Sequence, residues 1–279
     1  MNVTIIGIGL IGGSVARDLR RTGFATRLTG VGSTPARAEI ALRLGLVDRV
    51  ATLETAVREA DLVVLAIPVD RIVKLLPQVM DLVERQTVTD MGSTKQAIIE
   101  TIRHHPRRNR FVASHPMAGT ENSGPAAALE HLFEGKVAVL CDLEASAPDA
   151  VQTVEALYTA LGMRLVRMDA ATHDLHAAYV SHLSHVVSYA LALATLAKEK
   201  DDNAIFALAG GGLASTARLA KSAADIWVPI FHQNRAAVLD AIDTYQQKLQ
   251  ALRAAIDAGD ETRIRALIEE ANCIRRILP

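Results

Sequence analysis

Hydrophobic residues in the first 168 positions fall into short runs that alternate with longer amphipathic segments. The runs are rich in Val, Ile and Leu and lie at 3–6, 28–31, 61–67, 87–90, 111–114, 137–141 and 165–166. Short apolar runs of this kind are typical of strands buried on both faces, as in parallel sheets covered by helices. The pattern predicts an α/β fold with a doubly wound, mostly parallel sheet and a helix near 147–161.

The pattern changes after about Met168, where strand-like runs stop and helical periodicity takes over. We predict a long helix over 172–196 with Thr172 as its N-cap, an interruption at the glycines 210–212, and a last helix over 261–278. The expected organisation is two domains: a Rossmann-type domain over 1–168 and an all-helical domain over 169–279.

One predicted helix in the second half carries apolar residues spaced alternately four and three apart. This seam consists of Val238, Ile242, Tyr245, Leu249, Leu252 and Ile256. Such spacing is typical of a coiled-coil-like contact. The seam could face the chain's own core or a second subunit.

A glycine-rich turn follows the first strand and opens the first helix. Gly7, Gly9 and Gly12 form the pattern G-x-G-x-x-G, with Leu10 and Ile11 between the last two. In this context the first glycine permits a tight turn, the second lets the backbone approach a pyrophosphate, and the third allows close helix packing. The turn predicts a dinucleotide-binding site.

The end of the second strand carries information on which dinucleotide binds. NAD-binding domains usually place a carboxylate there, but none occurs between positions 30 and 38. Instead, Gly32, Ser33, Thr34 and Arg37 could surround a 2′-phosphate, with Arg37 pairing with it. We therefore expect NADP to be preferred over NAD, although the loop could also be merely permissive for both.

Other polar or turn residues follow the expected strand ends. Ile67 and Pro68 follow one strand, Ser93 another, and His115 lies where the run 111–114 stops. Because ligands bind at the carboxyl ends of parallel strands, these residues should share one crevice with Gly7. His115 is the candidate proton acceptor. Ser93 could be a helix N-cap, a ligand-contacting group, or both, since an N-cap hydroxyl can also meet a ligand.

The helical half adds further polar candidates. Ser181, His182 and His185 lie on roughly one helix face and could form the wall of a pocket. Arg218 is a candidate clamp for a carboxylate, with a surface arginine as the alternative. The histidine spacing does not match a zinc motif, so we expect no metal.

Composition narrows the function classes. The formal net charge is −1, so no strongly basic domain predicts nucleic-acid binding. Two distant cysteines and the absence of a basic-then-apolar N-terminal segment predict a cytoplasmic protein. The most apolar stretch, 186–197, is too short to span a bilayer, so no membrane partner is expected.

Taken together, these motifs resemble the prephenate/arogenate dehydrogenases of tyrosine biosynthesis. The matching segments run from end to end in the family's order: 7–14, 90–95, 115–121, His173-Asp174 with Ala178, Ser181-His182-Leu183 with His185, 210–212 with Arg218, Trp227, and Asn234-Arg235. The blocks at 114–121 and 173–185 are each fairly specific.

The resemblance implies a Rossmann-type domain followed by an all-helical dimerisation domain, and a homodimer. It implies oxidative decarboxylation, in which a hydride passes to NAD(P) and the substrate's ring becomes aromatic. By resemblance His115 accepts the proton of the ring hydroxyl, Ser93 supports that hydroxyl or the histidine, and Arg218 binds a substrate carboxylate. The remaining pocket residues that it implies are Thr120, Glu121, Ser181, His182, His185, Gly211 and Trp227.

This chain also departs from the family pattern. Leu213, Ala214 and Ser215 follow the glycines where many relatives have a phenylalanine, a basic residue and an aspartate. Ser184 stands where a proline is frequent. These departures leave open whether the substrate is prephenate or arogenate.

Two other functions remain as alternatives. A β-hydroxyacid-type dehydrogenase shares the two-domain plan but usually has an acid/base lysine on the long interdomain helix. Here the corresponding stretch offers histidines, and the first lysine after it is Lys198. A non-catalytic, nucleotide-sensing dimer is the second alternative.

Overall fold

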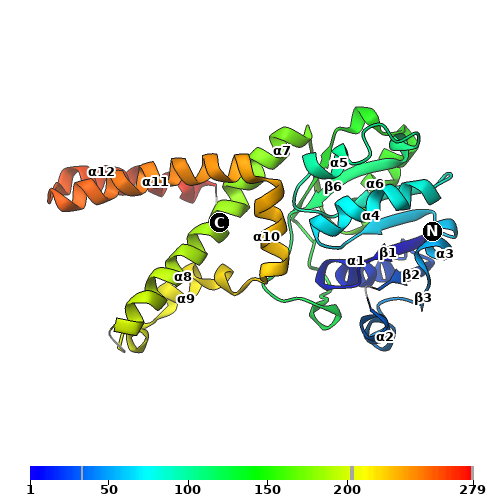
Figure 1. The fold of residues 1–279 in the computed structure, drawn as a ribbon, viewed down its shortest axis with the longest axis horizontal. Coiled ribbons are helices and arrows are strands. Elements are labelled where there is room, and N and C mark those ends of the chain that lie inside the picture. The colour runs from blue at the N-terminus through cyan, green and yellow to red at the C-terminus, as the bar shows by residue number, and fades with distance from the viewer. Residues whose placement is uncertain (33, 202–203, 278–279) are drawn as a thin grey trace.

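The computed structural model describes residues 1–32, 34–201 and 204–277, and Figure 1 shows a sheet domain joined to projecting helices. The sheet has eight strands in the order β3-β2-β1-β4-β5-β6-β7-β8, all parallel except for the antiparallel pair β6–β7. The strands are β1 (Asn2–Ile6), β2 (Arg27–Val31), β3 (Arg49–Val50), β4 (Leu62–Leu65), β5 (Thr87–Asp90), β6 (Phe111–Pro116), β7 (Val137–Cys141) and β8 (Arg164–Met168). The predicted doubly wound, mostly parallel fold is confirmed, with the short β3 as an additional strand.

Helices cover both faces of the sheet because successive strand residues point to opposite sides. Ile5 packs into the core on one face, and its neighbour Ile6 packs into the core on the other. The helices of this half are α1 (Leu10–Arg21), α2 (Pro35–Arg43), α3 (Leu53–Arg58), α4 (Val69–Leu82), α5 (Gln96–Glu100) and α6 (Pro148–Ala160). Helices α1 and α6 share the core of Ile5, whereas α4 and α5 share that of Ile6.

Two strand ends differ from the sequence prediction. β6 continues through Pro116 because its last four residues pair with β7, where His115 lies opposite Val139. His115 is therefore held in a strand and not in a loop, as the halt of the apolar run had suggested. β4 ends at Leu65, so Ile67 and Pro68 both lie beyond the strand, and Pro68 is the N-cap of α4.

The second half is helical, as predicted. Its elements are α7 (Ala170–Ala177), a π-helical turn (Ala178–His182), α8 (Leu183–Asp201), α9 (Gly211–Thr216), α10 (Ala224–Gln233), α11 (Arg235–Asp257) and α12 (Glu261–Asn272).

Three boundary predictions in this half were wrong. Asp169 caps α7, since its side chain accepts from the backbone N–H of Thr172 at 2.8 Å. Gly211 opens α9 instead of interrupting a helix, and α12 ends at Asn272, earlier than expected. Residues 278 and 279 of the predicted last helix lie outside the described residues.

The length argument against a membrane-spanning segment does not hold. α7, the π-helical turn and α8 form one run, Ala170–Lys200, that is long and apolar enough to cross a bilayer by length and composition alone. One such helix is weak evidence, because core helices of other proteins pass the same test. Its first turns bury His173 and Asp174, which is not typical of a lipid-facing helix.

The first part of the seam on α11 faces the chain's own core, and its later part is exposed. Val238 and Ile242 pack into a small core with Ala178 and Ala241, whereas the side chains of Leu249 and Ile256 are 51% and 65% exposed. α11 and α12 lie side by side and project away from the sheet (Figure 1).

Candidate active site between the sheet and the helical half

The glycine-rich turn between β1 and α1 brings two strand ends into contact. Gly7 has φ +95°, and a Cβ built on it would lie 2.4 Å from Ile67 Cγ2 and 2.5 Å from the carbonyl oxygen of Ala66. A Cβ on Gly12 would lie 2.1 Å from the carbonyl oxygen of Gly7. Only glycine fits at these two positions, so the turn and the segment that contains Ile67 form one packed unit.

The same turn fits the pyrophosphate of a dinucleotide. A Cβ on Gly9 would meet nothing within 4 Å, so backbone there faces open space. Gly9 is also the N-cap of α1, where no side chain caps the helix and no acidic residue lies in the first turn. Free N–H groups at the positive end of a helix dipole favour an anion. The side chain of Leu10 is buried in the core, and that of Ile11 is half-buried against it.

The end of β2 is open and lacks a carboxylate, as expected. Thr34 is the N-cap of α2, and its hydroxyl accepts from the backbone N–H of Arg37 at 3.3 Å. The side chains of Thr34 and Arg37 are exposed, and Gly32 packs on Ala38. Ser33, the fourth residue predicted for this site, lies outside the described residues.

His115 lies near the end of β6 and is only 7% exposed. Its Nδ1 lies 2.9 Å from Nε2 of His173, which α7 contributes from the helical half. Burial lowers the pKa of His115 well below its ordinary value, and the nearby charges of His173, Lys95 and His182 lower this pKa further. The ring is therefore neutral at pH 7, which is the state that a proton acceptor requires.

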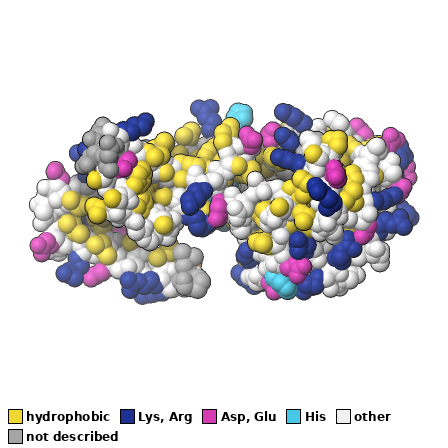
Figure 2. All heavy atoms as spheres, turned by 90° about the horizontal axis from the view of Figure 1, so that it is seen from below, with side chains coloured by type: hydrophobic (Ala, Val, Ile, Leu, Met, Phe, Trp, Pro, Cys, Tyr) yellow, Lys and Arg dark blue, Asp and Glu magenta, His cyan; other side chains and the backbone are white. Residues whose placement is uncertain are grey.

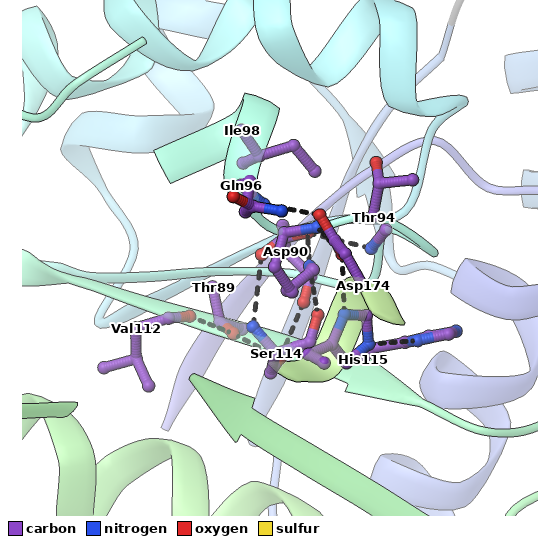
Figure 3. A network of polar contacts seen from close by, with 12 residues as sticks. Thr89, Asp90, Thr94, Gln96, Ile98, Val112, Ser114, His115 and Asp174 are labelled. Carbon is purple, nitrogen blue, oxygen red and sulfur yellow. Dashed lines mark hydrogen bonds and ion pairs between the residues drawn. The ribbon is translucent and has the colours of Figure 1, made fainter. Parts of the chain in front are cut away.

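A buried polar network lies next to His115 (Figure 3). Lys95 forms an ion pair with Asp90, and both side chains are fully buried. The Lys95 ammonium also donates to the carbonyl oxygen of Ser114 at 2.6 Å, and the Ser114 hydroxyl lies 2.6 Å from that of Tyr158. This network anchors the end of β5 to β6 immediately before His115.

Ser93 lies half-buried in the turn after β5. Among the described residues, no hydrogen bond joins its hydroxyl to His115. Ser93 is also not the N-cap of α5, because that position belongs to Lys95. Its expected role beside the substrate hydroxyl therefore stays a prediction.

Arg218 and Glu121 meet across the two halves of the molecule. A guanidinium nitrogen of Arg218 lies 3.3 Å from Glu121 Oε2, and the Arg218 side chain is 53% exposed. Thr120 is exposed in the same loop, where its hydroxyl accepts from the backbone N–H of Asn122. Figure 2 shows the surface hollowed between the two halves. The predicted carboxylate clamp is thus accessible and close to the predicted rim.

The helical half contributes an aromatic wall. His185 stacks on Trp227 with ring centroids 3.4 Å apart, and its Nδ1 donates to the carbonyl oxygen of Ser181 at 3.0 Å. Ser181 and His182 lie in the π-helical turn, and such turns are frequent at functional sites. Gly211 is exposed at the start of α9, with no contact that tests its predicted role.

His182 differs from the open pocket wall that the sequence suggested. It is fully buried, with Nδ1 3.1 Å from Asn234 Nδ2, while Nε2 has no partner among the described residues. Burial lowers its pKa to about 4, against the opposing effect of the Asp174 carboxylate. His182 is therefore a neutral, buried side chain behind Trp227, on whose ring it makes an edge contact.

Several residues of this network carried no individual role in the sequence prediction. Asp90, Lys95, His173, Asp174 and Asn234 all occur in the family-like segments, which was their only sequence signal. Across the described ranges, no group of three His, Cys, Asp or Glu side chains is placed to hold a metal ion.

Two family models together match most of the chain. "Prephenate dehydrogenase, nucleotide-binding domain" matches residues 15–167, and "Prephenate dehydrogenase, dimerization domain" matches residues 169–270. Prephenate dehydrogenase of Bacillus subtilis is 30% identical over 99% of this chain and 76% of its own length. Cyclohexadienyl dehydrogenase of Zymomonas mobilis is 30% identical over 93% of this chain and 89% of its own length.

Solved structures agree with the sequence relatives. Prephenate dehydrogenase from Aquifex aeolicus, in complex with hydroxyphenyl propionate and NAD⁺, superposes with a TM-score of 0.89 at 30% identity, covering 100% of this chain and 98% of that one. Synechocystis arogenate dehydrogenase superposes with a TM-score of 0.81 at 30% identity, covering 100% of both chains. These matches favour the resemblance over the β-hydroxyacid alternative, for which the long interdomain helix lacks the expected lysine before Lys198. The chain is an oxidoreductase with a nicotinamide-nucleotide-binding fold and belongs to the prephenate/arogenate dehydrogenase family.

Proposed function

We propose that the chain oxidises and decarboxylates prephenate, arogenate or both, and that His115 accepts the proton of the ring hydroxyl. The observation that carries the proposal is the state of His115: buried, neutral and hydrogen-bonded through Nδ1. Its second nitrogen, Nε2, is then the atom that accepts the proton from the substrate. The glycine turn at the same sheet edge supports a nucleotide beside it.

The proposed reaction balances without a metal. The O–H bond of the ring hydroxyl breaks and its proton passes to His115 Nε2, while a hydride leaves the carbon that bears this hydroxyl. The bound nicotinamide supplies the hydride acceptor. The ring carboxylate then leaves as carbon dioxide, its electron pair completes the aromatic ring, and the proton held at His115 Nε2 returns to the ring oxygen to form the phenol hydroxyl. The product is 4-hydroxyphenylpyruvate from prephenate or tyrosine from arogenate.

The other predicted residues bind the substrate. Arg218 holds a carboxylate with Thr120 and Glu121 at the rim, and Ser93 supports the hydroxyl. His185 and Trp227 line the pocket at the substrate's side chain together with Ser181 and Gly211, and the buried His182 lies behind Trp227.

A two-by-two assay tests the reaction: prephenate and arogenate, each with NAD⁺ and NADP⁺. His115→Asn should lower kcat about 100-fold or more, since a general base contributes about 10²–10⁴, while nucleotide binding persists. His104→Asn, at an exposed position, is the matched control. Absence of turnover in all four combinations, with nucleotide still bound, would support the nucleotide-sensing alternative instead.

We further propose that NADP is preferred. Support comes from the carboxylate-free segment 30–38 and the exposed Arg37 beside the N-terminus of α2. Arg37→Leu should raise the KM for NADP⁺ by about tenfold or more, because a charged hydrogen bond is worth about 1.5–3 kcal/mol, and should leave the KM for NAD⁺ unchanged. Arg43→Leu, at the other end of the same helix, is the control. A clear NAD⁺ preference of the unmodified protein contradicts this proposal.

We also propose a homodimer formed through the C-terminal helices. Leu249 and Ile256 on α11 and Ile268 on α12 are each at least half exposed, and the matched domain model is named for dimerisation. Light scattering after gel filtration should give twice the mass of one chain, and Leu249→Glu with Ile256→Glu should halve it. A cytoplasmic location, with no nucleic-acid or membrane partner, stays a prediction.

A further inference from the structure

The proposed base, His115, is the end of a chain of three buried side chains. His115 Nδ1 lies 2.9 Å from His173 Nε2, and His173 Nδ1 lies 2.8 Å from Asp174 Oδ1. His173 and Asp174 are each 2% exposed. The two imidazole rings meet edge to face at 70°, with centroids 5.1 Å apart. Water therefore does not compete for these hydrogen bonds.

The Asp174 carboxylate, the last of the three side chains, decides which group donates and which accepts in each hydrogen bond between them. Asp174 also accepts the backbone N–H of Lys95 at 2.7 Å and that of Gln96 at 3.0 Å. Burial alone would raise the pKa of Asp174, but the His173 bond and these two N–H groups outweigh it and lower the pKa. Asp174 is thus ionised at neutral pH and accepts every hydrogen bond that it makes.

The tautomers of both histidines follow from this assignment. Since Asp174 carries no proton, His173 Nδ1 must donate to it, and a His173 ring that holds only this one proton then accepts at Nε2. His115 Nδ1 must in turn donate to His173. The proton of neutral His115 is therefore on Nδ1, and Nε2 carries the lone pair.

We propose that His173 and Asp174 are positioning residues for His115. They hold it in the tautomer whose Nε2 accepts the substrate proton, and the Asp174 charge stabilises the imidazolium that forms. This inference rests on the proposed role of His115. No proton leaves His115 in the step: one O–H bond breaks, one Nε2–H bond forms, and the His115–His173 hydrogen bond becomes charge-assisted and stronger.

The charges near His115 oppose its protonation, so the imidazolium that forms during the reaction needs a compensating negative charge. Lys95 on the turn after β5 is a buried cation, and it lowers the pKa of His115 together with burial and the neighbouring histidines. Asp90 offsets the Lys95 charge through their ion pair. Asp174 is the other buried carboxylate in this network, and it reaches His115 only through His173.

The hydrogen bonds that link His115, His173 and Asp174 also join the two halves of the molecule. His115 belongs to β6 and the backbone N–H groups of Lys95 and Gln96 to the sheet domain, whereas His173 and Asp174 belong to α7. Asn234, between α10 and α11, donates to the carbonyl oxygen of Asp174 at 2.6 Å and so holds this end of α7. The base thus has its correct tautomer only when α7 is docked on the sheet.

Two substitutions at His173 separate positioning from packing. His173→Leu fills the space but makes no hydrogen bond, so kcat should fall about 100-fold, within the range for general-base catalysis. His173→Gln can accept from His115 through its oxygen and donate to Asp174 through its nitrogen, so it should recover kcat to within about tenfold of the original. The dissociation constant for the nucleotide should not change in either variant. His176→Leu, exposed one turn along the same helix, is the matched control.

A double-mutant cycle then assigns the effect to His115. In a His115→Asn background, His173→Leu should lower kcat by less than about threefold further, because residues that act as a unit are not additive. If His173→Leu fails to fold, Asp174→Asn provides the same comparison, since its amide can donate to His173 and reverse the tautomer.

Three outcomes overturn the proposal: near-normal kcat in folded His173→Leu, no recovery in His173→Gln, or the full 100-fold loss repeated in the His115→Asn background. The inference can fail while the proposed function stands, because the latter depends on His115→Asn alone. Normal kcat in His115→Asn would instead refute the proposed base.

Discussion

The buried His182 makes a quantitative prediction about stability in mild acid. Its ordinary pKa is 6.5, and burial lowers the pKa in the folded chain to about 4. Below pH 6.5 the unfolded chain therefore takes up a proton at this position, while the folded chain does not until pH approaches 4. The contribution of His182 to stability is complete above pH 6.5 and is lost as pH falls towards 4.

The magnitude follows from the two pKa values. One pKa unit corresponds to about 1.4 kcal/mol, so the difference at His182 amounts to about 3 kcal/mol across this window. His115 titrates in the same direction and adds to the total slope. The contribution of His182 must therefore be obtained as a difference between two proteins.

We expect His182→Gln to reduce the loss of unfolding free energy between pH 6.5 and 4 by about 3 kcal/mol. Glutamine can still accept a hydrogen bond from Asn234. Removing Nε2 of His182 breaks no hydrogen bond, because this atom has no partner among the described residues. Urea unfolding can be followed through Trp227, the only tryptophan, and by circular dichroism at fixed protein concentration. Equal pH slopes in His182→Gln and the unmodified chain would refute this reasoning. His104→Gln, at an exposed position, is the matched control.

Further substitutions test the nucleotide turn, the buried ion pair and the clamp. Gly7→Ala should lower the unfolding free energy by about 1–3 kcal/mol through its positive φ and the clash with Ala66 and Ile67, just beyond β4. Gly9→Ala should keep the melting temperature and raise the nucleotide KM at least about tenfold. Equal effects of the two substitutions on stability would contradict the geometry. Lys95→Met leaves the Asp90 carboxylate buried and unpaired and should cost about 3–5 kcal/mol in urea unfolding. Arg218→Gln should raise the KM for the cyclohexadienyl substrate by about tenfold or more, with a smaller change in kcat; an unchanged KM removes it as the carboxylate clamp.

Local patterns in the sequence were sufficient for seven of the eight strands, the glycine turn and the change to helices after Met168. Each depends on residues within a few positions of one another: a short apolar run, a spacing of glycines, a helical period. The family-like blocks added the reaction class, because they place a histidine, a serine and an arginine in a known order. For the same reason the sequence suggested His115 but assigned no role to His173 or Asp174.

The tertiary structure decided what depends on distant partners. β6 extends through His115 only because β7 pairs with it, and the hydrogen bond from His115 to His173 spans 58 positions of sequence. Arg218 meets Glu121 across 97 positions, and His182 lies behind Trp227 instead of in an open wall. Burial, tautomer and pKa are properties of such contacts and not of any one segment. The sequence by itself therefore determined the fold class and the candidate base, and only the folded chain decided which nitrogen of that base is free to accept a proton.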